Sequence, residues 1–444
     1  MSFTANDTIV AIATAYGVGA ICIIRISGSR ALSIATALSG CELKPRYATL
    51  VNLTSSKGEP LDEAIAIYFK APHSFTGEDV VELQTHGGIV VAQIVLAEIQ
   101  NHGARLADAG EFSKRAFING KIDLAKAEAI QAIISSQSES AVKILARSLR
   151  GELGEFVSEL RGELVRTLAY SETAIDYADD DLPEDILKST HEMLRKNVQK
   201  LDKIVSISQS RRGLIDGFRV AIIGKPNVGK SSLLNSLLHY ERAIISDEAG
   251  TTRDRIEESL KIGTHLVKII DTAGIRAGAG YVEAKGIEYS IAAASEADIV
   301  VCVFDGARIS DDEDRKILNL CQSLTGKKII YAFNKSDLEF KFDIDLADAV
   351  RISRHDTSEL ESALQAYLDS LETTSIMLSS TRQIDCSKAA SVALTRADEL
   401  LDEGSLELFS YELNKAILEL SNITEPFNRN EILDEMFSNF CLGK

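Results

Sequence analysis

The sequence predicts a multidomain protein that combines α/β and purely helical parts. Three observations lead to this fold class. The chain begins with β-rich runs mixed with helical stretches, continues with apolar residues recurring every three or four positions, and then alternates short apolar strands with helices. At about 100–200 residues per domain, its 444 residues allow two to four domains.

We expect residues 1–118 to form an amino-terminal α+β domain. Its apolar runs Ile21–Ile26, Glu63–Phe69 and Val80–Gln84 predict strands, and Ile89–Asn101 predicts a helix. The uncharged stretch before Arg25 contains glycines and follows no basic residue, so it predicts a buried strand with its turns. A signal peptide or a membrane-spanning helix would need a different pattern.

Residues 119–212 and 376–444 predict the two parts of one helical domain. Few helix-breaking residues occur in the first part, and its apolar positions recur at helical spacing. These positions are Leu149, Leu153, Phe156, Leu160, Leu164 and Leu168. Because helical texture returns after about Glu372, we expect the domain at 213–375 to be inserted into a helical bundle.

The charge is acidic and uneven. The chain has 66 Asp and Glu against 48 Lys and Arg, and 14 of the 18 excess negative charges lie after residue 212. Bulk attraction to nucleic acid needs basic residues against phosphates, so any nucleic acid must be held by local contacts or by another protein.

The six cysteines form no CxxC pair, which fits a reducing compartment. We expect a cytoplasmic protein without a membrane segment.

Residues 213–375 predict a doubly wound α/β domain with a parallel sheet. Its apolar runs end in Gly or Asp and precede helices: RVAIIG, KIIDTAG, DIVVCVFD and KKIIYAFNKSD. The first run leads into GKPNVGKSS, which fits the phosphate-loop pattern GxxxxGK[ST]. In that loop Lys230 would reach the β- and γ-phosphates and Ser231 would bind Mg²⁺. The expected nucleotide contacts here are Asn227, Val228, Gly229, Lys230, Ser231 and Ser232.

Three further elements follow in the order typical of a Ras-like G domain. Asp271, Thr272, Ala273 and Gly274 close one strand near the Mg²⁺ and γ-phosphate. Asn334, Lys335 and Asp337 close another, where a carboxylate can accept the two N–H donors of guanine. A first switch loop is expected at Ser246, Asp247, Glu248, Ala249, Gly250, Thr251 and Thr252. Together they predict a site for GTP rather than ATP.

The catalytic apparatus departs from the common arrangement. Many GTPases place a Gln after the DTAG glycine to orient the attacking water, but this position is Ile275. The nearby candidates are Arg276 and Glu283. A solvated loop charge for Arg276 and a helix-start acid for Glu283 are equally compatible with the residues alone.

The chain resembles the TrmE/MnmE family of tRNA-modification GTPases. The resemblance is carried by DTIVAIAT, SFTGEDVVELQTHGG, GEFSKRAFINGKIDLAKAEAI, GKPNVGKSSLLNSLL, SDEAGTTRD, DTAGIR and the final FCLGK. It implies a GTPase activated when two G domains meet, with K⁺ in place of an arginine finger. The implied K⁺ ligands are Asn227, Ser246, Glu248 and Thr251. Thr252 with Ser231 would hold Mg²⁺, and Glu283 would activate water.

The same resemblance implies that the amino-terminal domain binds a tetrahydrofolate derivative (5-formyl or 5,10-methylene) and forms a homodimer. The implied folate contacts are Arg25, Glu82, Lys121 and Lys444, with Cys441 as a candidate reactive thiol. Arg and Lys can pair with a glutamyl tail, and a carboxylate can accept two N–H bonds from a pterin edge.

Two segments depart from the family pattern. Ala15–Ala20 stands where the family has a Pro-Pro-Gly-Arg-Gly-Gly-like turn, so a basic residue is missing. Ala277–Tyr281 replaces acidic residues after DTAGIR while keeping the spacing to Glu283. We expect the first change to affect folate contacts and the second to affect the second switch loop.

The function implied by the family is the addition of a (carboxy)methylaminomethyl group to C5 of the wobble uridine of certain tRNAs. The resemblance also implies an FAD-dependent partner in a heterotetramer. Because no GxGxxG follows a strand here, the flavin would belong to that partner. One alternative is a ribosome-assembly or RNA-binding regulatory GTPase, which predicts a basic appendage that residues 376–444 do not provide. Another is a folate-binding module with a degenerate G domain, which the presence of Lys230, Asp271 and Asp337 disfavours.

Overall fold

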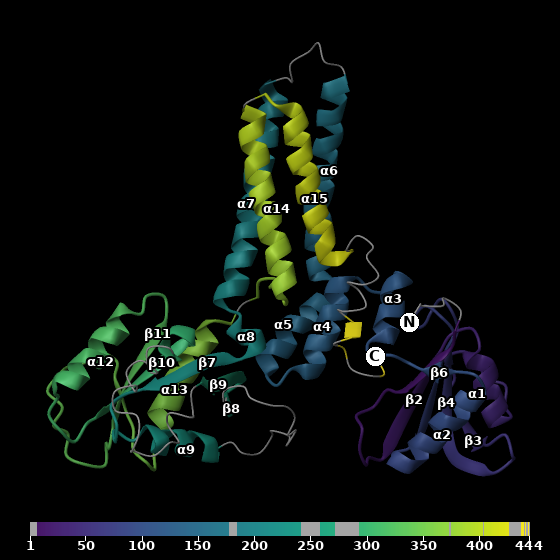
Figure 1. Ribbon diagram of the computed structural model, residues 1–444, viewed down its shortest axis with the longest axis horizontal. Helices are drawn as coiled ribbons and strands as arrows, with labels where there is room; N and C mark the ends of the chain where they lie inside the picture. The colour runs from purple at the N-terminus through teal and green to yellow at the C-terminus, as the bar shows by residue number, and fades with distance from the viewer. Residues whose placement is uncertain are drawn as a thin grey trace. The chain divides into compact units, whose positions relative to one another are not determined.

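The computed structural model describes residues 7–176, 184–240, 258–270, 293–372, 374–402, 404–425, 437–438, 440 and 443. Figure 1 labels the helices and strands of the chain. The chain divides into two compact units, each built from separate stretches of sequence. Unit 1 comprises residues 1–131, 154–191 and 392–444, and unit 2 comprises residues 132–153 and 192–391. These units cut across the ranges 119–212 and 376–444, so the four-domain division stays a prediction.

The amino-terminal part of unit 1 is an α+β fold built on a six-stranded sheet of order β3-β4-β5-β2-β1-β6. All neighbouring strands pair antiparallel except β1 and β6. The strands are β1 (Ile9–Ile12), β2 (Ile21–Ser27), β3 (Thr49–Thr54), β4 (Pro60–Phe69), β5 (Val80–His86) and β6 (Arg105–Leu106). The α+β character predicted for this part is confirmed.

Helices α1 (Ala31–Ser39) and α2 (Ile89–Asn101) cover one face of this sheet. Strand residues alternate between the helix-covered core and the opposite face, as period-two geometry requires. In β2, Ile24 and Ile26 are fully buried while Ile21 is 59 % exposed. On the opposite face, Ile21 of β2 and Ile65 of β4 are exposed, while Arg25 of β2 lies beside the rings of Phe75 and Phe112.

The predicted strands and helix of this part are all present, with longer bounds for β2, β4 and β5. The uncharged stretch before Arg25 forms β1, which is almost wholly buried, then an exposed turn, then the start of β2. β1 is thus the buried strand predicted in this stretch, and β2 is the strand predicted at Ile21–Ile26.

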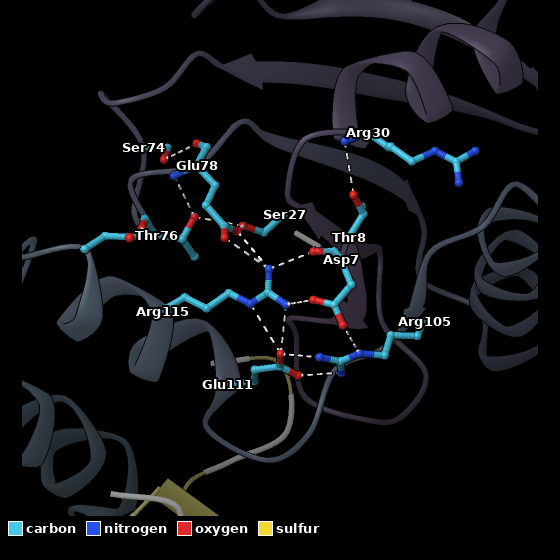
Figure 2. Close-up of polar contacts among 11 residues, drawn as sticks. Asp7, Thr8, Ser27, Arg30, Ser74, Thr76, Glu78, Arg105, Glu111 and Arg115 are labelled. Atoms are coloured by element: carbon cyan, nitrogen blue, oxygen red, sulfur yellow. Dashed lines mark hydrogen bonds and ion pairs between the residues drawn. The ribbon is translucent and has the colours of Figure 1, made fainter. Parts of the chain in front are cut away.

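Helix α3 (Glu111–Ile118) is fixed to the sheet by a buried network of charged groups (Figure 2). The Arg115 side chain is only 3 % exposed and pairs with the carboxylates of Asp7, Glu78 and Glu111. Arg105 bridges two of the same acids, Asp7 and Glu111. Removing one partner of such a network leaves a buried charge unpaired, which is costly. The network therefore favours this one position of α3.

Near the far end of the chain, Phe437, Phe440 and Gly443 pack against residues of unit 1. Phe437 is 1 % exposed and packs with Leu124 and Ala127. Glycines at the contact leave room for backbone approach. A Cβ added at Gly110 would lie 2.4 Å from the Phe437 carbonyl oxygen, and one at Gly443 would lie 2.2 Å from the Ile12 carbonyl oxygen.

Long helices make up the remaining parts of both units, as the sequence predicts. They are α4 (Leu124–Ser135), α5 (Glu139–Arg150), α6 (Glu152–Asp176), α7 (Glu184–Ser210), α14 (Thr381–Asp402) and α15 (Leu406–Thr424). Helices α7 and α14 are joined by polar contacts within each unit: His191 Nδ1 lies 2.5 Å from Asp398 Oδ1 in unit 1, and Ser391 Oγ lies 2.6 Å from Asp202 Oδ1 in unit 2.

The apolar row from Leu149 to Leu168 is not one continuous helical face. Gly151 has φ +94°, a left-handed conformation that ends α5, and α6 begins at the next residue. Leu149 is 37 % exposed, while Leu153 and Leu160 are buried. The break changes the face that the chain buries.

Unit 2 contains the doubly wound α/β fold, with a sheet of order β12-β11-β10-β7-β9-β8. Its strands are β7 (Phe218–Ile223), β8 (Glu258–Ile262), β9 (His265–Ile270), β10 (Ile299–Asp305), β11 (Lys328–Asn334) and β12 (Val350–Arg351). All neighbours pair parallel except β8, which forms an antiparallel edge with β9. The four predicted parallel strands are confirmed, and β8 and β12 are additions.

Helices cover both faces of the unit 2 sheet. Helices α9 (Lys230–Tyr240) and α13 (Ser358–Ser370) pack on one face, and α12 (Asp312–Ser323) packs on the other. A short helix, α8 (Gly213–Asp216), leads into β7. Strand β10 is buried along its whole length, as expected for a central parallel strand. Among the described residues, no helix combines the length and apolar composition needed to cross a bilayer.

Candidate functional site

The candidate site lies at the carboxyl end of β7, which runs between β10 and β9. Residues 224–229 leave this strand as a loop, and α9 begins at Lys230. Gly224 has φ +155° and a Cβ there would lie 2.4 Å from the Val303 carbonyl oxygen. The loop therefore passes close against β10, and only glycine fits at its first position.

Lys230 lies folded back over its own loop. Its Nζ donates hydrogen bonds to the carbonyl oxygens of Gly224 (2.6 Å) and Lys225 (2.7 Å). Burial lowers the pKa of this amine because the charged form loses water. The amine is thus held at the loop and at the amino-terminal end of α9, where backbone N–H groups favour anions.

The Asn334 side chain ties the loop to the end of β11. Its Nδ2 donates to the Val228 carbonyl oxygen at 2.7 Å, and Val228 itself is fully buried. Gly229 has φ +98°, and a Cβ there would lie 2.0 Å from Asn334 Nδ2. The phosphate loop and the expected base-reading segment therefore form one connected corner, which sequence spacing alone does not show.

Lys335 continues this corner in a left-handed conformation, with φ +65°. Its Nζ donates to Asp305 Oδ2 at 2.6 Å, and Asp305 pairs in register with Asn334 across β10 and β11. Asp337 is exposed, so its carboxylate is accessible to a base. Asn227, with φ +62°, and Ser231 are also exposed.

Several predicted site residues lie outside the described residues. They are Ser246, Asp247, Glu248, Ala249, Gly250, Thr251, Thr252, Asp271, Thr272, Ala273, Gly274, Arg276, Glu283, Cys441 and Lys444. The altered segment Ala277–Tyr281 lies outside them as well. Their assignments stay predictions.

In unit 1, the structure brings Arg25 and Glu82 together. They are register partners on β2 and β5, and Arg25 Nε donates to Glu82 Oε1 at 2.9 Å. The Arg25 guanidinium also lies 5.6 Å from the centroid of the Phe75 ring. Lys121 is exposed and lies over Gly77, where an added Cβ would be 3.1 Å from Lys121 Cε.

The altered turn of unit 1 lines a cavity of about 310 Å³. Tyr16, Gly17 and Val18 contribute to it, together with Cys22 and the start of α2 at Ile89. Arg25, Glu82 and Lys121 are not among its lining residues. The cavity is thus separate from the three predicted folate contacts that the structure describes.

Sequence reasoning missed one charged cluster beside the nucleotide loop. Lys225 pairs with Asp311 and Asp314 at the beginning of α12. The phosphate-loop pattern leaves this lysine position open, so the motif carries no signal for it. The spacing of Asp311 and Asp314 ahead of a helix is typical of a capping box, and that signal could have located α12's first turn.

These features define a phosphate-loop GTPase. They are a loop that requires glycine, a lysine bonded to the carbonyl groups of that loop, and an Asn-Lys-x-Asp segment bonded to the same loop. Two family models extend this class. "GTP-binding protein TrmE N-terminus" matches residues 8–121, and "MnmE helical domain" matches residues 124–441. The chain therefore belongs to the MnmE family of tRNA modification GTPases, as the resemblance in the sequence indicated.

Curated relatives match along nearly the whole chain. The tRNA modification GTPase MnmE of Campylobacter curvus is 62 % identical over 441 residues, which cover 99 % of each protein. That of Campylobacter concisus is 59 % identical over 99 % of this chain and 100 % of the relative. The second family model starts before the unit 2 sheet and ends after it, which agrees with insertion of the α/β domain into a helical one.

Solved structures resemble a smaller part of the chain. The crystal structure of the G domain of the T. maritima FeoB iron transporter covers 35 % of this chain and 99 % of that one, at 24 % identity and a TM-score of 0.25. At that score the likeness adds nothing to the family assignment.

Proposed function

We propose that this chain hydrolyses GTP in a reaction stimulated by K⁺ and by dimerisation of its G domains. With an FAD-dependent partner, it adds a (carboxy)methylaminomethyl group to C5 of the wobble uridine of certain tRNAs. The observation that carries this proposal is the intact nucleotide corner, with Asn334 bonded to Val228 and Lys230 held on the loop, in a chain of this family.

For GTP, Lys230 is the residue that turns from the loop carbonyls to the β- and γ-phosphates. Asp337 accepts the N–H donors of guanine, and its exposure supports that role. Ser231 and Thr252 would hold Mg²⁺, which neutralises charge on the phosphates when bound. The Ser231 hydroxyl fits this role because it is exposed at the first turn of α9.

K⁺ would be held by Asn227 with Ser246, Glu248 and Thr251. The fit rests on Asn227, whose left-handed conformation and exposure leave its amide oxygen accessible at the loop. When bound, a monovalent cation offsets the charge that develops between the phosphates, the task of an arginine elsewhere. Glu283 orients the attacking water, and Arg276 is the neighbouring candidate for a catalytic group.

For the one-carbon unit, the proposed ligand is a tetrahydrofolate derivative held by Arg25, Glu82, Lys121 and Lys444. The Arg25 and Glu82 pair supports this because both side chains stay partly accessible, at 18 % and 16 % exposure. Such a pair offers both donors and acceptors to a planar heterocycle. Cys441 is the candidate thiol near this site.

The proposed assembly is a homodimer joined by the FAD-dependent partner in a heterotetramer. The acidic charge of the chain supports a division of labour in which the partner holds much of the tRNA. Because tRNA modification requires access to tRNA, the cytoplasm is the compartment that this function calls for.

Mass spectrometry of tRNA nucleosides from cells lacking this chain tests the proposal. The wobble-uridine modification should be missing and should return with the wild-type chain. It should not return with Lys230→Met, whereas Lys316→Met, which changes an exposed lysine on α12, should restore it. A normal modification level in the deleted cells would refute the proposed function.

A further inference from the structure

Lys225, the second residue of the phosphate loop, has an unusual environment for a lysine. Its side chain is only 3 % exposed, and its Nζ lies 2.5 Å from Asp311 Oδ2 and 2.6 Å from Asp314 Oδ2. A lysine is rarely buried unless it is paired. Here two carboxylates provide the pairing, and both come from the first turn of α12 or the residue just before it.

These carboxylates are themselves held in fixed positions. Asp311 caps α12, since its Oδ1 accepts from the backbone N–H groups of Glu313 (3.0 Å) and Asp314 (3.1 Å). Asp314 Oδ2 accepts from the Asp311 N–H at 3.1 Å, which completes the capping box. The helix end is therefore a rigid base to which the Lys225 ammonium is attached.

The backbone of the same lysine faces the nucleotide side. The carbonyl oxygens of Gly224 and Lys225 are the two acceptors that hold Lys230 Nζ. Lys225 thus joins two parts of the site: its side chain binds the end of α12, and its carbonyl group holds Lys230. Fixing the Lys225 side chain fixes the peptide on which Lys230 rests.

A direct phosphate contact for Lys225 does not fit this geometry. Its ammonium is enclosed with two carboxylates and almost inaccessible to water. The second oxygen of Asp314, Oδ1, is buried and has no hydrogen-bond partner within the described part of the chain. Two carboxylates face one ammonium, so this cluster already carries excess negative charge. That charge binds the ammonium in place and would repel phosphate.

We propose that Lys225 is a positioning residue for nucleotide binding, which acts by clamping the phosphate loop to the capped end of α12. The clamp pre-forms the carbonyl pair at residues 224 and 225, so that the loop is ordered before nucleotide arrives. Without it, the loop must be ordered during binding, and that cost appears as weaker affinity. Once nucleotide is bound, the phosphates themselves order the loop, and the rate of the chemical step is little changed.

The first test is Lys225→Met in the full chain, with affinity for a fluorescent methylanthraniloyl-GDP and steady-state GTP turnover as measurements. The dissociation constant should rise about 10-fold, while kcat stays within about twofold. Lys316→Met, an exposed lysine on the same helix, is the matched control and should change neither. An unchanged dissociation constant in folded Lys225→Met would overturn the proposal.

A second variant separates positioning from simple stability. Lys225→Met leaves Asp314 buried without its counter-charge, which lowers stability. Adding Asp314→Asn removes that charge and keeps an acceptor for the Asp311 N–H. The double variant should melt near the wild-type temperature and still bind the fluorescent GDP about 10-fold more weakly. Recovery of affinity together with stability would show that Lys225 is only structural.

The inference rests on the proposed role of Lys230, and the two fail in different ways. Lys230→Met in the same assay should weaken binding beyond Lys225→Met and also abolish turnover. If Lys230→Met binds and hydrolyses normally, the proposed role of Lys230 is wrong. If only the Lys225 variants behave like wild type, the clamp alone is wrong.

Discussion

Gly229 shows how one missing side chain shapes the nucleotide corner. It occupies a left-handed conformation directly beneath the Asn334 amide, at the point where the phosphate loop meets the end of β11. Any Cβ at this position would displace the Asn334 side chain from the Val228 carbonyl. The contact between the phosphate loop and the base-reading segment therefore requires glycine, which has no Cβ, at position 229.

Gly229→Ala should weaken GDP binding at least about 10-fold, because the clash with Asn334 moves both parts of the site. The measurement is the dissociation constant of methylanthraniloyl-GDP. Gly326→Ala is the matched control: Gly326 also has a positive φ, +77°, but open space surrounds its Cβ position. This control should cost about 1 kcal/mol of stability and leave binding unchanged. Equal losses for the two variants would contradict the role given to Asn334.

At the scale of one element, α3 is held by charge pairs of Arg115 as well as by the buried Phe112. Burial alone would raise the pKa of Glu111, but hydrogen bonds from Arg105, the Asp108 N–H and Arg115 outweigh burial and lower it. A carboxyl with a lowered folded pKa stabilises the fold above its unfolded pKa, near 4.5 here, and that stabilisation is lost as the pH falls. The α3 region should therefore loosen below about pH 4.5.

Arg115→Met should destabilise the α3 region by about 3–5 kcal/mol at pH 7, because it leaves buried carboxylates without their shared cation. Hydrogen exchange of peptides covering residues 111–118, corrected for intrinsic rates, is the measurement. Exchange should be much faster at pH 7 and less dependent on acid than in the wild type. Arg46→Met, an exposed arginine of the same unit, should behave like the wild type. Unchanged protection in Arg115→Met would show that apolar packing holds α3.

At the scale of the whole molecule, the proposed GTP hydrolysis depends on K⁺ and on dimerisation. GTP turnover should be at least about 10-fold faster in KCl than in NaCl, the size of effect expected for a charge-stabilising group. Because the proposed active form is a dimer, the rate per molecule should fall once dilution dissociates that dimer. Asn227→Ala should remove the preference for KCl while GDP still binds. Equal turnover in the two salts would rule out the K⁺ role.

Sequence reasoning recovered the parts of this fold that repeat a pattern. The parallel strands were predicted because a strand that is buried on both faces, such as Ile299–Asp305, appears in the sequence as a continuous apolar run. The phosphate loop and the Asn334 corner were predicted because their residue types recur at fixed spacing. The left-handed Gly151 was missed, since apolar periodicity does not respond to the φ angle of a single residue.

The site was harder to predict wherever it depends on contacts between distant residues. Lys225 meets Asp311 and Asp314 only after β10 and β7 pair, and the loop motif places no restriction on its side chain. The Arg115 network likewise joins Asp7, Glu78 and Glu111 from three separate segments. Charge pairs of this kind follow from topology, so a local pattern does not reveal them.

The packing of Phe437 and Gly443 on unit 1 determines when the fold of this unit can be completed during synthesis. The amino-terminal sheet leaves the ribosome early, yet the aromatic side chain beside Leu124 is that of Phe437 and the backbone beside Ile12 is that of Gly443. At about 5–20 residues per second, the intervening chain takes roughly 15–60 s to make. The first part of the chain to emerge is thus the last to complete its packing. Until then, the apolar surface around Leu124 stays exposed and is available to a chaperone.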